Sequence, residues 1–280
     1  MLKYINILLD DAAVSFCHYD VRKKSKPISE EILNKGIRFA MKENLNIQFI
    51  YPIHKLPSYV DEDVNQVDHI KIGKDDVIVY DSWPKKFELD KICVLRLDKD
   101  SLLSQRLPGL LPKRLNIVIT DIDTFTEEYY DRYKKWLELE ARKLKLQSCQ
   151  INILTDRIYL ERMNNCNAGW ETITLAPDGN FYICPAFYQN DMNCVGDLKN
   201  GLNIPNAQLY RLEHAPICCH CDAYQCRRCI WLNFKSTLEV NTPSHEQCVV
   251  AHLERNATRI VAPDIIQEIK YLDPFDIITR

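Results

Sequence analysis

Short apolar runs alternate with amphipathic stretches along the first half of the chain. Six of the runs are rich in β-branched residues, which predicts buried parallel strands; they lie at 4–9, 47–52, 77–81, 92–97, 116–120 and 150–154. A helix is expected from Ser29, as its N-cap, to about Glu43. A longer helix is expected over about 125–146, with Thr124 and Glu127 as its capping box. This alternation predicts an α/β fold with a mainly parallel sheet and covering helices.

The second half of the chain has a different pattern. Residues 170–184 alternate apolar and polar side chains around Pro177-Asp178-Gly179, which predicts a β-hairpin. Further on, Ser244 and Gln247 have the spacing of a capping box, so Cys248 is expected in the first turn of a helix. A helix N-terminus lowers the pKa of a thiol, and this position therefore suits a cysteine that binds metal as a thiolate.

Cysteines are concentrated in the second half. The chain has 280 residues and 12 cysteines, of which Cys17, Cys93 and Cys149 alone precede residue 166. Cys93 and Cys149 fall in or beside apolar runs and are expected to be small core residues. The shift in composition predicts three parts: a thiol-poor βα domain at 1–158, a cysteine-rich domain at 159–256, and a partly helical C-terminal tail at 257–280.

Charge and hydropathy limit the compartment and the partners. The formal net charge is −3, from 36 basic and 39 acidic residues, so we expect neither a nucleic-acid partner nor a membrane partner. No apolar run approaches the ~20 residues of a transmembrane helix. The N-terminal MLKYINILLDD lacks the basic region and the cleavage site of a signal peptide. We therefore expect a cytoplasmic protein, in which clustered cysteines favour metal binding over disulfides.

The candidate metal site is centred on PICCHCDAYQCRRCIW at 216–231. Two cysteines separated by two residues can bind one metal centre from a single turn, and sets of four thiolates hold either zinc or iron–sulfur clusters. His220 and His245 lie nearby and would suit zinc. The cysteines are numerous enough to supply two four-coordinate metal centres. The candidate ligands are Cys166, Cys184, Cys218, Cys221, Cys226, Cys229 and Cys248.

The spacing of these cysteines over about 160–255 resembles the SPASM domain, the auxiliary-cluster module of many radical SAM peptide-modifying enzymes. That family has a cysteine, a glycine about a dozen residues later, a second cysteine, a run of four cysteines and a last one. Here Cys166, Gly179 and Cys184 match the beginning of that pattern and Cys248 its end, and the strings APDGNFYIC and CVGDL are also similar. The run of four cysteines is shorter than in the family. Four residues separate Cys221 from Cys226 and two separate Cys226 from Cys229, where five and three are common.

The resemblance implies two 4Fe–4S clusters. It assigns one cluster to Cys166, Cys184 and Cys229. It assigns the other to Cys218, Cys221, Cys226 and Cys248. The first set has three cysteines, which Cys194, a non-cysteine ligand or an open iron site could complete. Cys219 has no assigned role, and zinc stays open as the alternative metal.

A working radical SAM domain needs a CxxxCxxC loop after its first strand, and this chain has no CxxxCxxC. The corresponding segment reads LDDAAVSFCHYD and retains Cys17, followed by His18. The expected fold is therefore a degenerate, shortened radical-SAM-like parallel βα domain, followed by a small SPASM-like metal-binding domain. We expect no binding of S-adenosylmethionine. Cys17, His18, Asp10 and Asp11 could contact a ligand at the carboxyl ends of the strands, but capping and solvation of the loop are the favoured explanation.

The whole chain resembles the CXXX repeat peptide maturase family. The strings that carry the resemblance are ILLDDAAVSFCHYD, GIRFAMKENLNIQFIYP, CDAYQCRRC and LEVNTPSHEQCVVAHLERNA. The resemblance implies an iron–sulfur protein in the maturation of ribosomally made cysteine-repeat peptides, without its own S-adenosylmethionine radical chemistry. Its partners would be a cysteine-rich precursor peptide and a companion modification protein. The alternative is a zinc-stabilised, non-catalytic adaptor that presents the precursor peptide to a partner enzyme.

Overall fold

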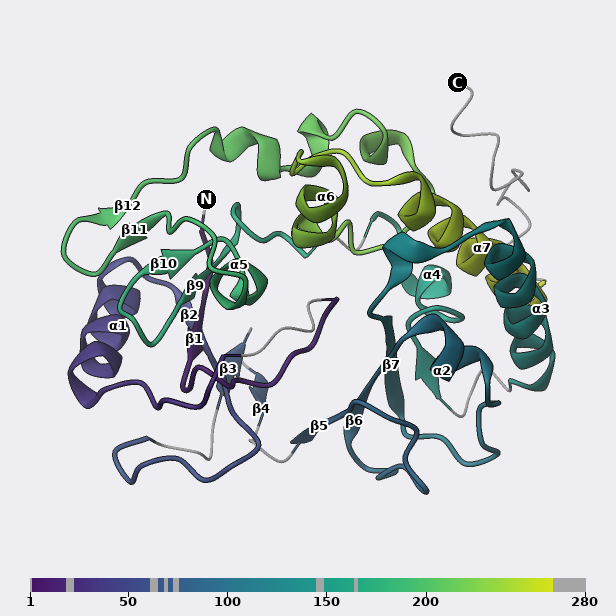
Figure 1. Ribbon diagram of the computed structural model, residues 1–280, viewed down its shortest axis with the longest axis horizontal. Coiled ribbons are helices and arrows are strands. Elements are labelled where there is room, and N and C mark those ends of the chain that lie inside the picture. Colours follow the sequence, from purple (N-terminus) through teal and green to yellow (C-terminus); the bar gives the residue numbers. More distant parts are fainter. Residues whose placement is uncertain are drawn as a thin grey trace. The chain divides into compact units, whose positions relative to one another are not determined.

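The computed structural model describes residues 2–18, 23–60, 65–67, 70–72, 76–144, 149–163 and 166–263. These residues form two compact units, each assembled from separate segments (Figure 1). The first unit takes its residues from 1–15, 19–76 and 167–215, and the second from 16–18, 77–166 and 216–280. The expected domains at 1–158, 159–256 and 257–280 are segments of the sequence, and the compact units combine parts of them.

The first unit contains a four-stranded sheet in the order β10-β9-β1-β2. Its strands are β1 (Tyr4–Leu8), β2 (Asn46–Ile50), β9 (Thr172–Leu175) and β10 (Phe181–Tyr182). β1 is parallel to both β2 and β9, whereas β10 runs antiparallel to β9. The predicted strands at 4–9 and 47–52 and the hairpin at 170–184 are confirmed. Gly179 turns the hairpin with a φ of +85°, a backbone conformation that glycine adopts readily.

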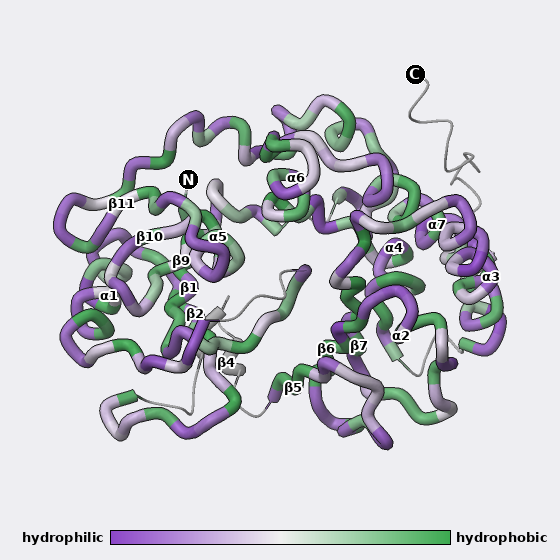
Figure 2. The backbone as a smooth tube through the Cα atoms, in the orientation of Figure 1, coloured by the Kyte–Doolittle hydropathy of each residue, from purple (hydrophilic) through white to green (hydrophobic). Residues whose placement is uncertain are grey.

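Helix α1 (Glu30–Lys42) begins where the sequence predicted. The Ser29 hydroxyl accepts a hydrogen bond from the backbone N–H of Ile32 at 3.2 Å, as an N-cap does. Gly36 lets the helix approach the sheet closely, because a Cβ at this position would lie 2.3 Å from Cδ2 of Leu175. Figure 2 shows hydrophobic residues along much of β1, where Ile5 and Ile7 are fully buried.

Smaller elements complete the first unit. They are β3 (Asn65–Val67), β4 (Ile70–Ile72), α5 (Pro185–Gln189), β11 (Gly196–Asp197) and β12 (Gly201–Leu202). β3 pairs antiparallel with β4, and β11 pairs antiparallel with β12. Gly196 has no room for a side chain, since a Cβ there would lie 2.1 Å from the carbonyl oxygen of Gly201.

The second unit contains an all-parallel sheet in the order β5-β6-β7-β8. Its strands are β5 (Val77–Tyr80), β6 (Ile92–Leu97), β7 (Arg114–Ile119) and β8 (Gln150–Ile151). All four were predicted, but β8 is shorter than the expected 150–154. The strand ends early because the chain turns back on itself there. The backbone N–H of Thr155 donates to the carbonyl of Ile151 at 2.8 Å, and the Thr155 hydroxyl accepts the backbone N–H of Ile151.

Five helices of the second unit are described: α2 (Lys99–Leu103), α3 (Glu127–Lys143), α4 (Asp156–Tyr159), α6 (Ile230–Thr237) and α7 (His245–Val261). The predicted capping box of α3 is wrong. Thr124 lies in a 3-10 turn, and its hydroxyl donates to the carbonyl of Asp121 at 2.8 Å. The N-cap position falls to Thr126, whose side chain makes no capping hydrogen bond.

Helices α3 and α7 pack together in the core of the second unit. Tyr133 and Leu137 of α3 and Val250 and Leu253 of α7 are buried in the same cluster. The phenol of Tyr133 donates a hydrogen bond of 2.8 Å to Oε1 of Glu254, which lies inside this core. Burial raises the pKa of the Glu254 carboxyl to about 8.

The predicted α/β class with parallel sheets is confirmed. Cys93 and Cys149 are buried in the core of the second unit, as expected. Among the described residues, no helix combines the length and the apolarity needed to cross a bilayer. The part of the expected C-terminal tail that is described continues α7 to Val261, and residues 264–280 lie outside the described residues.

Replacement of Ser244 tests the capping of α7. The Ser244 hydroxyl accepts the backbone N–H of Gln247 at 3.2 Å, so Ser244→Ala should lower the free energy of unfolding by about 1 kcal/mol. The matched control is Thr126→Ala, because Thr126 precedes a helix of the same length without a capping bond. Urea unfolding followed by tryptophan fluorescence measures both variants, and equal losses would contradict this assignment.

Glu254 should make stability depend on pH. Its folded-state pKa of about 8 exceeds the value of an unfolded glutamate, so its contribution is complete below about pH 4 and is lost as pH rises towards 8. Glu254→Gln should therefore match the wild type near pH 4 and exceed its free energy of unfolding by about 4 kcal/mol at pH 8, at 1.36 kcal/mol per pKa unit. Urea unfolding at both pH values measures the difference, with the exposed Glu161→Gln as a control that should show no such trend.

Candidate metal centre

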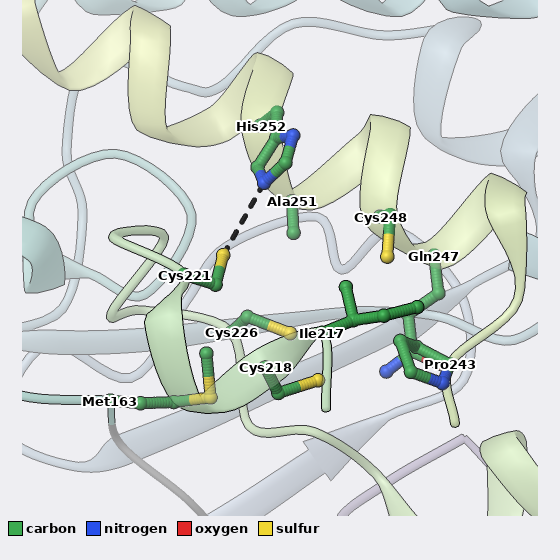
Figure 3. A pocket seen from close by; sticks show the side chains of 10 residues that line it. All are labelled: Met163, Ile217, Cys218, Cys221, Cys226, Pro243, Gln247, Cys248, Ala251 and His252. Atoms are coloured by element: carbon green, nitrogen blue, oxygen red, sulfur yellow. Dashed lines mark hydrogen bonds between the residues drawn. The ribbon is translucent and has the colours of Figure 1, made fainter. Parts of the chain in front are cut away.

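Four cysteine thiols line one pocket in the second unit. The four are Cys218, Cys221, Cys226 and Cys248. Figure 3 shows their sulfur atoms around a common space, with Met163, Ile217 and Pro243 also on its wall. About 320 Å³ is free of protein atoms there, including space open to solvent. These four are the set that the SPASM resemblance assigned to one cluster, and the fold brings them together.

Two tight turns and one helix position the four thiols. Cys218 opens a 3-10 turn over Cys218–His220, and the backbone N–H of Cys221 bonds to the carbonyl of Cys218 at 3.2 Å. A second turn follows, in which the N–H of Cys226 bonds to the carbonyl of Ala223 at 2.9 Å. Cys248 is in the first turn of α7, where its N–H bonds to the carbonyl of Ser244 at 3.2 Å. The cap at Ser244 thereby sets the register of the fourth thiol.

Two of the sulfur atoms accept hydrogen bonds from the backbone. The N–H of Ala223 donates to Sγ of Cys221 at 3.4 Å, and the N–H of Arg228 donates to Sγ of Cys226 at 3.5 Å. Each donor lies two residues after its cysteine, so the turn itself aims the N–H at the sulfur. Arg228 adopts a φ of +44° to do so, a conformation that is uncommon for any residue other than glycine. Hydrogen bonds to sulfur stabilise thiolate ligands and tune the clusters that they hold.

His252 is a pocket residue that the sequence analysis missed. Its Nε2 lies 3.4 Å from Sγ of Cys221, and its side chain is 1% exposed. His252 follows Cys248 by four residues, and positions i and i+4 share one face of a helix. That spacing was a usable signal in the sequence, whereas His220 and His245, which the sequence analysis did consider, do not line the pocket.

Buried arginines surround the thiols. Arg228 and Arg255 are both fully buried, and Arg255 forms an ion pair with Asp222. Arg157 donates from Nε to the carbonyl of Asp222 at 2.7 Å and stacks on the ring of Tyr224 at 3.9 Å. Positive charge buried beside sulfur favours the thiolate over the thiol.

Desolvation nevertheless dominates the ionisation of the thiols. Burial raises the pKa of Cys218, Cys226 and Cys248 to about 12 and also raises the pKa of Cys221. The expectation that the N-terminus of α7 lowers the pKa of Cys248 is therefore wrong: burial raises this pKa, and the charges of Cys226, Cys221 and Glu246 raise it further. The metal-free thiols are protonated at neutral pH, and metal binding must release those protons.

The remaining predicted ligands are divided between the units. Cys166 is exposed in the second unit, and its N–H bonds to the carbonyl of Arg227 at 3.1 Å, beside the cysteine run. Cys229 is half-buried at the N-cap of α6 and packs against the core of that unit. Cys184 is half-buried at the N-cap of α5 in the first unit, and Cys194 is exposed in that unit. A cluster at Cys166, Cys184 and Cys229 stays a prediction.

Among the described residues, no group of three or more His, Cys, Asp or Glu side chains is gathered as a single metal ion would require. Zinc binds thiolates at about 2.3 Å, which places four tetrahedral sulfurs about 4 Å from one another. All four cysteines line the wall of the pocket. Cys219, which has no assigned role, has its sulfur 3.6 Å from the carbonyl of Pro216 and is not on that wall.

The candidates near the first strand make structural contacts. Nδ1 of His18 lies 2.9 Å from the carbonyl of Ile119, and burial lowers the pKa of its imidazole. Asp10 is fully buried and accepts the N–H of Ala12 at 2.6 Å. Asp11 accepts the phenol of Tyr188 at 2.6 Å. These contacts hold the loop after β1, and a ligand contact at these residues stays a prediction.

Comparison with known proteins adds no family to this picture. No protein-family model matches the chain, and no curated protein matches it. The resemblances to the SPASM domain and to the CXXX repeat peptide maturases therefore depend on the strings and spacings of the sequence. The geometry of the four thiols provides a separate basis for a functional argument.

Proposed function

We propose that this protein binds iron–sulfur clusters and acts in the maturation of ribosomally made cysteine-repeat peptides, without radical chemistry of its own on S-adenosylmethionine. The observation that carries the proposal is the single pocket lined by Cys218, Cys221, Cys226 and Cys248. These residues would hold one 4Fe–4S cluster. The resemblance to the SPASM domain implies a second cluster with Cys166, Cys184 and Cys229 among its ligands.

The presence of four thiols on one pocket wall suits a 4Fe–4S cluster. In a 4Fe–4S cluster each thiolate binds a different iron, so the four sulfurs surround the metal centre at a distance from one another. Four cysteines on the wall of a pocket suit that arrangement. A single zinc ion would instead require the four sulfurs to lie about 4 Å from one another.

The charges around the pocket also suit an iron–sulfur cluster. Four thiolates bring more negative charge into the pocket than the iron–sulfur core offsets, and a buried charge is expensive unless it is paired. Arg228 and Arg255 are buried beside the thiols and favour the ionised forms of Cys218 and Cys221, respectively. The N–H groups of Ala223 and Arg228 already point at sulfur atoms. The protein thus supplies the positive charge and the hydrogen-bond donors.

A bound cluster would supply electron transfer, or an iron site that can bind a thiolate, and the chain would supply its orientation and its shielding from water. Met163, Ile217 and Pro243 form an apolar part of the pocket wall. A cysteine-repeat peptide offers many thiols, which makes it a chemically suitable partner for such a site. A companion protein would carry out the bond-forming chemistry that the absent CxxxCxxC loop would otherwise support.

The second candidate function is a zinc-stabilised adaptor that presents the precursor peptide to a partner enzyme. The observation that favours it is the chemistry of the donors, because two Cys-x2-Cys pairs are also typical of structural zinc sites. In this case the metal would stabilise the cysteine-rich segment and would take no part in electron transfer. Metal analysis separates the two functions.

Anaerobic purification tests the proposed clusters. The wild-type protein should contain about eight irons and eight sulfides, with a broad absorption near ~400 nm, as two 4Fe–4S clusters require. Cys226→Ser should reduce the iron to about four by removing one ligand of the pocket. Cys149→Ser is the matched control, because Cys149 is buried in the same unit but does not line the pocket. A colourless protein with stoichiometric zinc would overturn the cluster and favour the adaptor.

Mass spectrometry of a co-expressed cysteine-repeat peptide tests the role in maturation. With the companion protein present, the peptide mass should change in the presence of the wild-type protein and stay unchanged in its absence. Cys226→Ser should lose the mass change, and Cys149→Ser should retain it. A mass change that Cys226→Ser fully supports would show that the pocket has no part in the modification.

A further inference from the structure

We infer that His252 sets the reduction potential of the cluster in the pocket by donating a hydrogen bond from Nε2 to Sγ of Cys221. The inference depends on the proposed cluster and adds a role for a residue that is not one of its ligands. His252 would be a positioning residue, acting on the cluster through the sulfur of Cys221.

The position of His252 is set by α7. Its Nε2 is 3.4 Å from Sγ of Cys221, as the dashed line in Figure 3 shows. Cys248 and His252 are four residues apart on the helix, so the same face presents one ligand and one hydrogen-bonding group to the pocket. The imidazole is 1% exposed, and water therefore competes little for this contact.

Metal binding decides the direction of the hydrogen bond. In the metal-free protein, Cys221 is a thiol that can donate to Nε2 of the imidazole. A metal-bound cysteine has lost its proton and can only accept. The contact is then attractive only if Nε2 of His252 carries the hydrogen, and a neutral imidazole can carry it there. Loading of the site thus makes His252 the donor.

A donor at this sulfur favours the reduced cluster. Reduction adds an electron, and part of the added negative charge resides on the thiolate sulfurs. A hydrogen bond stabilises that charge, more strongly in a buried site than in water, and hydrogen bonds to sulfur are among the factors that set cluster potentials. Cys221 also accepts the N–H of Ala223 at 3.4 Å. It therefore has two donors in the loaded site, one from the backbone and one from a side chain that substitution can remove.

Substitution of His252 in the cluster-loaded protein tests the inference. His252→Leu should retain the wild-type iron content and should shift the one-electron equilibrium about tenfold towards the oxidised cluster, which corresponds to about 59 mV to more negative potential. His252→Gln keeps an N–H donor and should recover most of that shift. His220→Gln is the matched control, because His220 is exposed within the cysteine run and does not line the pocket.

Anaerobic redox titration followed by electron paramagnetic resonance measures the potential. The relevant signal is the one that Cys226→Ser removes, so that the second cluster does not interfere. A wild-type potential in His252→Leu at full iron content would overturn the inference and leave the proposed clusters intact. Strong nitrogen coupling to the wild-type cluster, with loss of iron in both His252 variants, would overturn it by showing that His252 is a ligand. A wild-type protein without iron would overturn the proposed function together with the inference.

Discussion

Helix α7 is buried on more than one side, and the structure of the second unit depends on this burial. One side packs into the apolar core, where Val250 and Leu253 lie beside α3. Another side faces the pocket with Cys248 and His252. A helix enclosed in this way must satisfy its polar groups within the protein, which explains why Glu254 bonds to Tyr133 and why Arg255 pairs with Asp222. The packing of the core and the shape of the pocket are consequently properties of the same helix.

Two requirements that favour different residues meet at Arg228. Its backbone turns through a positive φ to aim an N–H at Cys226, and its side chain brings a fully buried cation beside Cys218. Glycine would relieve the backbone strain and remove the cation. Lysine would keep a charge but not the planar, delocalised guanidinium that suits buried ion pairs. The turn within the cysteine run therefore also restricts which residues can stand between the ligands.

The helices and strands could be predicted where residues close together in the sequence determine them. The strands followed from β-branched runs, and Ser29 and Ser244 were identified as helix caps because their capping bonds lie within three residues. Thr124 failed as a cap because its hydroxyl bonds instead to the backbone of Asp121 in a 3-10 turn. The assembly of each unit from separate segments depends on contacts between distant parts of the chain. Such contacts have no local signature in a single sequence.

The candidate site was predictable in its cysteines but not in its environment. The resemblance to the SPASM domain grouped Cys218, Cys221, Cys226 and Cys248. The ionisation of Cys248 was mispredicted because the helix N-terminus is visible in the sequence, whereas burial is not. His252 was missed for a related reason, since its partner Cys221 is 31 residues away along the chain.

The high pKa of the pocket thiols has a consequence for the protein before any metal arrives. Thiolates, not thiols, are the species that oxidants and disulfides attack. Thiols whose pKa is raised in this way by burial are almost entirely protonated at pH 7. Burial therefore slows the reaction of the pocket cysteines with oxidants, the reaction by which neighbouring thiols are joined in disulfides.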